Sequence, residues 1–130
     1  MENKEQEITA RFAKYEQQIR QLQQQFQAVE ESIVELNILD LGLDNLSGKV
    51  GEEIMAPIGR GIFVKAELKS EELTVDIGNQ NLVKKSIPET KKILKTQITK
   101  LGEIKKELEN KMDEIQEEAK EFIMGMQGEE

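Results

Sequence analysis

The apolar residues of the first third of the chain recur at intervals that alternate between four and three. They form an unbroken seam of Ile8, Phe12, Tyr15, Ile19, Leu22, Phe26, Val29, Ile33 and Leu36. Gln, Glu, Lys and Arg fill most positions between them, as the solvated faces of a helix require. Since this heptad spacing is typical of a coiled coil, we predict a helix over residues 1–46 that packs along a partner helix.

The spacing of the leucines changes near the end of this helix. The next leucines are Leu39, Leu43 and Leu46. Relative to the preceding seam they shift the apolar stripe around the helix. We interpret the shift as the place where the helix leaves its partner helix and begins to pack on strands. Glycines follow, and residues 47–53 are expected to form a short connector.

Between residues 54 and 87 the apolar residues recur at every second position, which is the period of a β-strand. Ile62 and Val64 fall on one face of the first such run, whereas Phe63 and Lys65 fall on the other. Glycine and asparagine between the runs tolerate the positive φ angles of tight turns. We therefore predict two consecutive β-hairpins, with strands near residues 54–58, 62–68, 73–77 and 82–87.

Short hairpins of this kind are barely stable on their own in water. The strands are therefore expected to find partners outside their own chain, because free strand edges pair readily with other strands. The residues predicted to take part in this subunit assembly are Ile58, Ile62, Val64, Val75 and Ile77.

A second heptad seam predicts a helix over residues 88–126, followed by a tail at residues 127–130. Its members are Leu94, Ile98, Leu101, Lys105, Leu108, Met112, Ile115, Ala119, Phe122 and Met126. Two heptad helices joined by a segment that reverses the chain are expected to pack antiparallel, with Phe12 near Phe122. The predicted fold class is mainly α with a small β part: a long antiparallel coiled-coil helical hairpin with two β-hairpins at its base.

Two features of the second helix, its N-cap and the role of Lys105, can each be interpreted in two ways. Ser86 and Glu89 fit a capping box; in the other arrangement Ile87 is the cap and Pro88 is the first helical residue. Lys105 is the polar member of the seam. It is either a snorkelling side chain or a residue that sets the register of the two helices.

The composition limits the function classes. Net charge is −8 and the pI is near 4.8, which argues against binding to nucleic acid or to an anionic membrane. The chain contains no cysteine, so a reducing compartment is allowed, and neither a leader sequence nor a membrane span stands out. We expect a soluble cytoplasmic protein.

The sequence carries no recognisable catalytic constellation. Without His or Cys, most nucleophile–base pairs and soft metal sites are excluded. The aspartates at Asp40 and Asp44 do not complete a calcium loop, and Val64 stands where a dinucleotide motif needs its third glycine. We therefore predict no enzyme, with no catalytic, metal-binding or cofactor-binding residue.

The order of long heptad helix, paired hairpins and long heptad helix resembles the alpha subunit of prefoldin. The likeness is carried by Ile-Met-Ala-Pro-Ile-Gly at residues 54–59 and by Gly-Ile-Phe-Val-Lys-Ala at residues 61–66. In the second hairpin it is carried by Val-Asp-Ile-Gly at residues 75–78 and by Leu-Val-Lys-Lys-Ser at residues 82–86. The polar run at residues 78–81 departs from the smaller residues frequent in the family, which affects only a turn.

This resemblance implies an ATP-independent chaperone of the archaeal type, a holdase that needs no cofactor. Two alpha and four beta subunits would join their β-hairpins into intersubunit β-barrels, from which six coiled-coil arms project. The tips of the arms would hold non-native polypeptides, the clients, and deliver them to a group II chaperonin.

The residues expected to bind unfolded clients lie near the two ends of the chain, where a partner helix cannot fully cover the last seam residues. They are Ile8, Phe12, Phe122, Ile123, Met124 and Met126. The alternative for Phe12 and Phe122 is that they only close the end of the coiled coil.

A competing function is that of a structural or adaptor coiled coil, or of a filament-forming prefoldin-like paralogue, which binds one defined partner. Polar specificity positions at the tips would favour that function, whereas apolar tips with methionine favour the chaperone.

Overall fold

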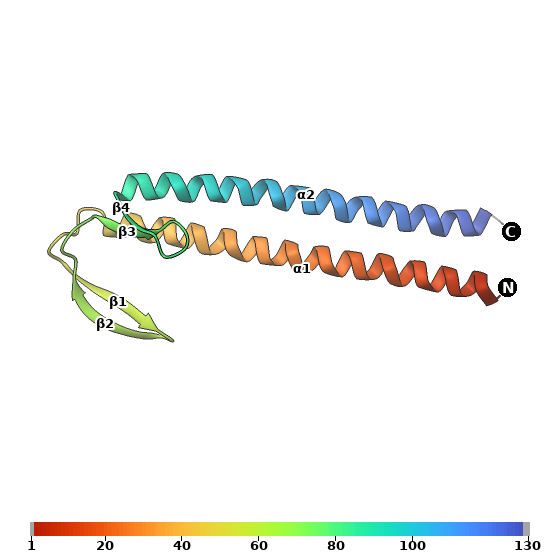
Figure 1. Cartoon of the computed structure of the whole chain (residues 1–130), viewed down its shortest axis with the longest axis horizontal. Coiled ribbons are helices and arrows are strands. Elements are labelled where there is room, and N and C mark those ends of the chain that lie inside the picture. Colours follow the sequence, from red (N-terminus) through yellow and green to blue (C-terminus); the bar gives the residue numbers. More distant parts are fainter. Residues whose placement is uncertain (1, 129–130) are drawn as a thin grey trace. The chain divides into compact units, whose positions relative to one another are not determined.

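The computed structural model of the protein describes residues 2–128 and the side chains of residues 3–126. Its elements in chain order are α1 (Glu2–Leu46), β1 (Glu53–Gly59), β2 (Ile62–Glu67), β3 (Leu73–Asp76), β4 (Leu82–Lys85) and α2 (Ile87–Gly128) (Figure 1). Two long helices with two small antiparallel hairpins confirm the predicted fold class.

The chain forms two compact units, which we describe separately. The two-helix unit joins α1 up to Val34 to α2 from Thr99 onward, and the hairpin unit comprises Glu35–Ile98. The described part of the two-helix unit contains no strand, so its packing is between helices.

The predicted seams form the interface of the two-helix unit. Every seam residue from Ile8 to Ile33 and from Leu101 to Met126 is buried or half-buried, whereas most residues between them are exposed. Phe12 packs against Phe122 with the ring centroids 5.6 Å apart. This contact places the first turns of α1 beside the last turns of α2, so the helices of this unit run antiparallel, as predicted.

Lys105 reaches across this interface. Its Nζ lies 3.9 Å from Oε2 of Glu30 and 5.3 Å from the ring centroid of Phe26, and both partners belong to α1. Contacts to the partner helix favour the register-setting role over simple snorkelling. Because both charged groups are at least about a third exposed, the ion pair contributes no more than about 1 kcal/mol.

The core of the hairpin unit joins the end of α1 to the first turns of α2 and to β3. Leu43, Ile87 and Leu94 are buried, and Leu36, Leu46 and Leu73 pack against them. The N–H of Glu89 donates a hydrogen bond to Oγ of Ser86 at 3.2 Å. Ser86 rather than Ile87 is therefore the N-cap of α2.

The predicted departure of α1 from its partner helix after Leu36 is wrong. Leu43 lies in one cluster with Leu94 of α2, so the two helices stay together to the end of α1. Asp40 occupies the heptad position between Leu36 and Leu43 and is half-buried, whereas Leu39 is 48% exposed. Apolar spacing alone overlooks this seam position because aspartate is polar.

Asp40 meets a lysine at the matching position of the α2 seam. Nζ of Lys91 lies 3.9 Å from Oδ1 of Asp40 and is also hydrogen-bonded to Oδ1 of Asp44. Oδ1 of Asp40 is buried and has no hydrogen-bond partner among the described residues, so the nearby ammonium compensates its charge. The hydrogen bond to Asp44 raises the pKa of Lys91. Desolvation opposes this rise, and the negative charges of Asp40 and Asp44 add to it.

We expect Lys91 to make the chain less stable at alkaline pH. A lysine whose pKa is raised by folding contributes its full stabilisation below its unfolded pKa of about 10.4, and this contribution is lost as the pH rises through the higher folded pKa. Thermal unfolding of the full chain by circular dichroism, from about pH 8 to about pH 12, measures the loss. Lys91→Met should be less stable at the lower pH and should show a smaller alkaline decline.

Lys92→Met is the control for this experiment, because Lys92 is the exposed neighbour of Lys91. It should keep the alkaline decline of the unmodified chain. If Lys91→Met keeps the full decline as well, Lys91 is not the group responsible.

Each hairpin is a separate two-stranded antiparallel sheet. In the first, Ala56 pairs with Val64, and the register shifts at a bulge between Pro57 and Gly59. In the second, Val75 pairs with Val83. Neither sheet closes into a barrel or joins the other within the described chain, so both keep free edges.

The turn of the second hairpin explains its polar residues. Asn79 and Gln80 have φ angles of 50° and 62°, and the N–H of Asn81 donates to the carbonyl oxygen of Gly78 at 3.0 Å. Two successive positive φ angles define a type I′ turn, whose twist matches that of the flanking strands. The polar run therefore forms a regular hairpin turn.

Candidate functional site

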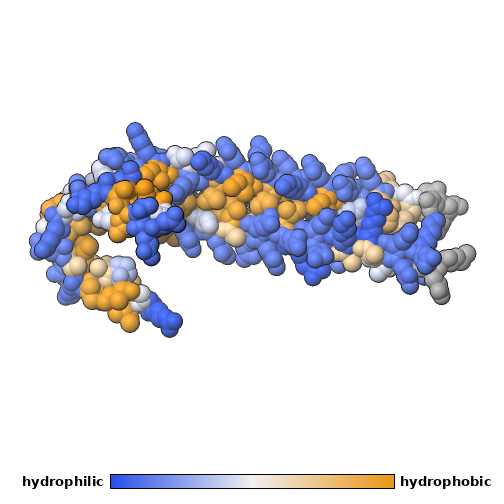
Figure 2. All heavy atoms as spheres, viewed as in Figure 1, coloured by the Kyte–Doolittle hydropathy of each residue, from blue (hydrophilic) through white to orange (hydrophobic). Residues whose placement is uncertain are grey.

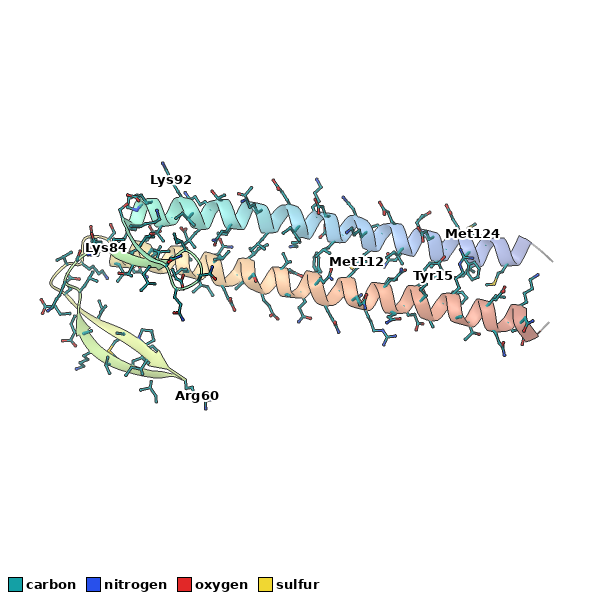
Figure 3. The ribbon with its side chains drawn as sticks, viewed as in Figure 1. Tyr15, Arg60, Lys84, Lys92, Met112 and Met124 are labelled. Carbon is teal, nitrogen blue, oxygen red and sulfur yellow. The ribbon has the colours of Figure 1, made fainter. Side chains whose placement is uncertain are left out.

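The tip of the two-helix unit, around Ile8 of α1 and Met126 of α2, contains the residues predicted to bind clients. Ile8, Phe12, Phe122 and Met126 are half-buried along the seams. Ile123 and Met124 point away from the seam and are 39% and 64% exposed. The tip therefore presents apolar side chains that the helix pair leaves uncovered (Met124 and the nearby Tyr15 are labelled in Figure 3).

Phe122 is the centre of an aromatic cluster at the tip. Its ring lies edge-on to Phe12 and to the buried Tyr15, with a centroid distance of 6.3 Å to Tyr15. Edge-to-face pairs of this kind contribute about 0.5–1.5 kcal/mol beyond the area that they bury. Phe12 and Phe122 thus close the end of the coiled coil, while the exposed apolar area comes mainly from Ile123 and Met124.

A groove of about 520 Å³ opens beside this cluster. It is lined by Lys4, Glu7, Ile8, Arg11, Phe122, Gly125 and Met126. Its volume falls within the range of small-molecule and side-chain binding sites. We call it the tip groove.

The charged residues of the tip groove could not be identified from the spacing of apolar residues. Lys4 and Arg11 lie seven residues apart and flank the α1 seam, at the edge positions that set partner choice in coiled coils. That spacing is the signal that could have identified them. The guanidinium carbon of Arg11 lies 4.9 Å from the ring centroid of Phe122, which is a cation–π contact.

The hairpins hold the residues predicted for subunit assembly. Ile58, Ile62, Val64 and Ile77 are exposed, and so are Met55, Phe63 and Leu82, which the sequence interpretation did not include. Figure 2 shows hydrophobic residues gathered on the β1–β2 hairpin. Exposed apolar area beside free strand edges is the arrangement that strand pairing with another chain would cover.

Val75 differs from the other assembly residues because it is half-buried. Its neighbours on the same face of the second hairpin are Leu73 and Val83, which are also half-buried, and Leu73 packs on the core of the unit. The side chain of Val75 therefore belongs to the face that the hairpin turns toward its own helices.

The hairpin unit also has a more open hollow of about 830 Å³, lined mostly by lysine and glutamate. Two of its lysines already have acidic partners, since Lys84 lies 3.6 Å from Glu72 and Lys91 is bonded to Asp44. Among the side chains of residues 3–126, no group of acidic residues is arranged to hold a metal ion. No helix in the described chain has the length and apolar character needed to cross a membrane.

Comparison with known proteins identifies the family. A family model described as Prefoldin subunit matches residues 15–129 of this chain. The chain belongs to the prefoldin family. The family assignment confirms the resemblance to prefoldin that the sequence indicated.

Several archaeal relatives named prefoldin subunit alpha are similar to this chain. That of Methanobrevibacter smithii is 37% identical over 102 residues, which cover 78% of this chain and 65% of the relative. That of Methanosphaera stadtmanae is 35% identical over 86 residues, or 61% and 62% of the two chains. That of Thermofilum pendens is 31% identical over 97 residues, or 73% of each. The matches to the first two thus span slightly less than two thirds of those relatives.

A solved structure supports the fold. The cryo-EM structure of a filamentous PFD from Methanocaldococcus jannaschii superposes with a TM-score of 0.80 at 20% identity, covering 90% of this chain and 98% of that chain. The predicted prefoldin architecture, including hairpins that do not close into a barrel within one chain, is thereby confirmed.

Proposed function

We propose that this chain is the alpha subunit of a prefoldin holdase, which binds non-native polypeptides at its tip without ATP. The observation that carries the proposal is the uncovered apolar area of Ile123 and Met124 at the tip of the two-helix unit. Methionine and isoleucine in such a place offer adaptable apolar contacts to many sequences. A partner-specific adaptor would instead need polar positions that reject wrong partners.

The assembly that we propose contains two copies of this chain and four prefoldin beta subunits, working in the cytoplasm. Its hairpins would add to those of neighbouring subunits in an intersubunit β-barrel, which would pair the free edges of both sheets. Bound clients would then pass to a group II chaperonin. The net charge of −8 makes nucleic acid and anionic membranes poor alternative partners.

The direct test is suppression of aggregation. A chemically denatured protein is diluted into buffer with and without the assembled complex, in the absence of nucleotide, and light scattering is recorded. A holdase should suppress the scattering of several unrelated clients at close to stoichiometric amounts. An adaptor for one folded partner should leave the scattering of all of them unchanged.

A filament-forming prefoldin is the second candidate, because the solved structure with a TM-score of 0.80 comes from a filamentous PFD. The relatives that share 31–37% identity are named prefoldin subunit alpha, which favours the first candidate. Native mass of the chain expressed alone discriminates the two. A long ladder of homo-oligomers supports the filament, whereas a requirement for the beta subunit supports the alpha-subunit assignment.

A further inference from the structure

We infer that the tip groove selects client segments in which a large apolar side chain lies next to an aspartate or glutamate, and that Arg11 determines this preference. The inference rests on the proposed binding of clients at the tip. It adds a ligand class and a specificity-determining residue.

The lining of the groove has two chemical parts. Ile8, Phe122 and Met126 supply apolar side chains, and Gly125 supplies backbone with no side chain. A Cβ built on Gly125 would meet no atom within 4 Å, so the groove is open at this position. An apolar client side chain can therefore lie against Phe122 and Met126 with its backbone close to α2.

The charged part of the lining that meets its apolar part is Arg11. Lys4, Glu7 and Arg11 are the charged residues of the groove, and the guanidinium of Arg11 is the group that lies over the ring of Phe122. A carboxylate beside the bound apolar side chain is attracted to this guanidinium, whereas a lysine at the same place is repelled.

Arg11 is positioned to make the selective contact. Its guanidinium lies over the ring of Phe122, and no hydrogen bond or ion pair involving it occurs among the described residues. Stacking on a ring uses the flat face of the guanidinium and leaves the N–H donors at its edge for a carboxylate, which they can bind in a bidentate manner. Glu7 lies one turn earlier on α1 and is not ion-paired to Arg11. The N–H edge of the Arg11 guanidinium therefore has no described partner on α1.

The test uses the assembled prefoldin complex and three fluorescent peptides that share one Phe-Leu core and differ only in their flanking residues, which are aspartate, serine or lysine. Fluorescence anisotropy at low salt should show that the aspartate peptide binds about three- to fivefold more tightly than the lysine peptide, as expected for a partly exposed ion pair. Arg11→Gln should abolish the difference and Arg11→Glu should reverse it. Added salt should weaken the preference.

Two matched controls separate the groove from general effects. Arg20→Gln removes an exposed arginine of α1 that lies 4.0 Å from Glu16, and it should leave the preference unchanged. Gly125→Leu should fill the groove and weaken all three peptides, whereas Gly102→Leu, at an equally open glycine of α2, should weaken none. Both leucines favour the helix, so poor folding would not explain a loss of binding.

Equal affinity for the aspartate and lysine peptides, or an unchanged preference in Arg11→Glu, would overturn the inference. So would unchanged peptide binding in Gly125→Leu. These results would leave the proposed holdase function intact if the complex still suppresses client aggregation. Loss of that suppression in every complex, including the unmodified one, would instead remove the proposed function.

Discussion

Removing residues 1–12 together with residues 119–130 should abolish the suppression of client aggregation and leave the oligomer intact. The deletion takes away the tip groove and the exposed side chains of Ile123 and Met124. The hairpins, to which we assign subunit assembly, remain complete. The expected result is light scattering of a denatured client at the level seen without chaperone, from a complex whose native mass falls only by the mass of the deleted residues.

Point variants test the same surface with less change to the helices. Ile123→Ser combined with Met124→Ser should weaken client binding by roughly five- to thirtyfold, because partial burial of two such side chains contributes about 1–2 kcal/mol. The matched control is Ile104→Ser, since Ile104 is 43% exposed on the same helix and lies outside the tip. Full protection of clients by the deleted chain, or equal losses in the tip and control variants, would contradict the tip assignment.

The second large effect is expected from Val64→Asp, which should convert the assembly into monomers or small oligomers. Val64 is 44% exposed and pairs with Ala56 on the face of the first hairpin that also carries Ile54 and Ala66. If a neighbouring subunit covers this face, a carboxylate there becomes buried without a partner. Burial of such a charge costs several kcal/mol even after relaxation of the surroundings. Each subunit contact that buries Val64 should lose about this much binding free energy.

Multi-angle light scattering measures this outcome. Lys65→Glu is the control, because Lys65 is the next residue on the opposite face and its contact with Glu53, at 3.8 Å, is an exposed ion pair. It should leave the oligomer unchanged. An unaltered oligomer in Val64→Asp, with the helices folded by circular dichroism, would reject the assembly role of this face.

Val75→Asp is a less direct test of assembly. Val75 shares its face with Leu73, which packs on the core of the hairpin unit, so a charge there should also lower the thermal stability of the chain. Comparison of the two variants therefore separates contacts between subunits from packing within one subunit.

The helices and strands follow from periodicity in the sequence. Heptad spacing located both helices because apolar side chains at intervals of four and three must be covered by another helix. The alternation of apolar and polar residues around Val64 and Val75 located the two hairpins, because one face of each strand must be covered. Ser86 could be recognised as a cap from its side chain, but only the hydrogen bond from Glu89 decided between it and Ile87.

The polar part of the helix interface could not be predicted from apolar spacing. Asp40 and Lys91 occupy seam positions, yet each is interpretable as a surface residue until the opposite helix is known. Only their proximity makes the pair compatible with partial burial. The same limit applies to Lys105 and Glu30 in the two-helix unit.

The tip shows why site residues are harder to predict than elements. Its apolar members are identifiable as the last residues of two seams. Arg11 becomes notable only because antiparallel packing brings Phe122 under its guanidinium, and Gly125 only because the groove opens at its bare backbone. Likewise, alternation places Val75 on a strand face but does not say whether its own helices or another subunit covers that face.

Co-expression with a prefoldin beta subunit, followed by native mass spectrometry, tests most directly whether the hairpins of this chain are completed by other subunits. We predict a discrete complex with two copies of this chain and four copies of the partner. A chain that stays monomeric beside an abundant beta subunit, with its helices and hairpins folded, would contradict the account.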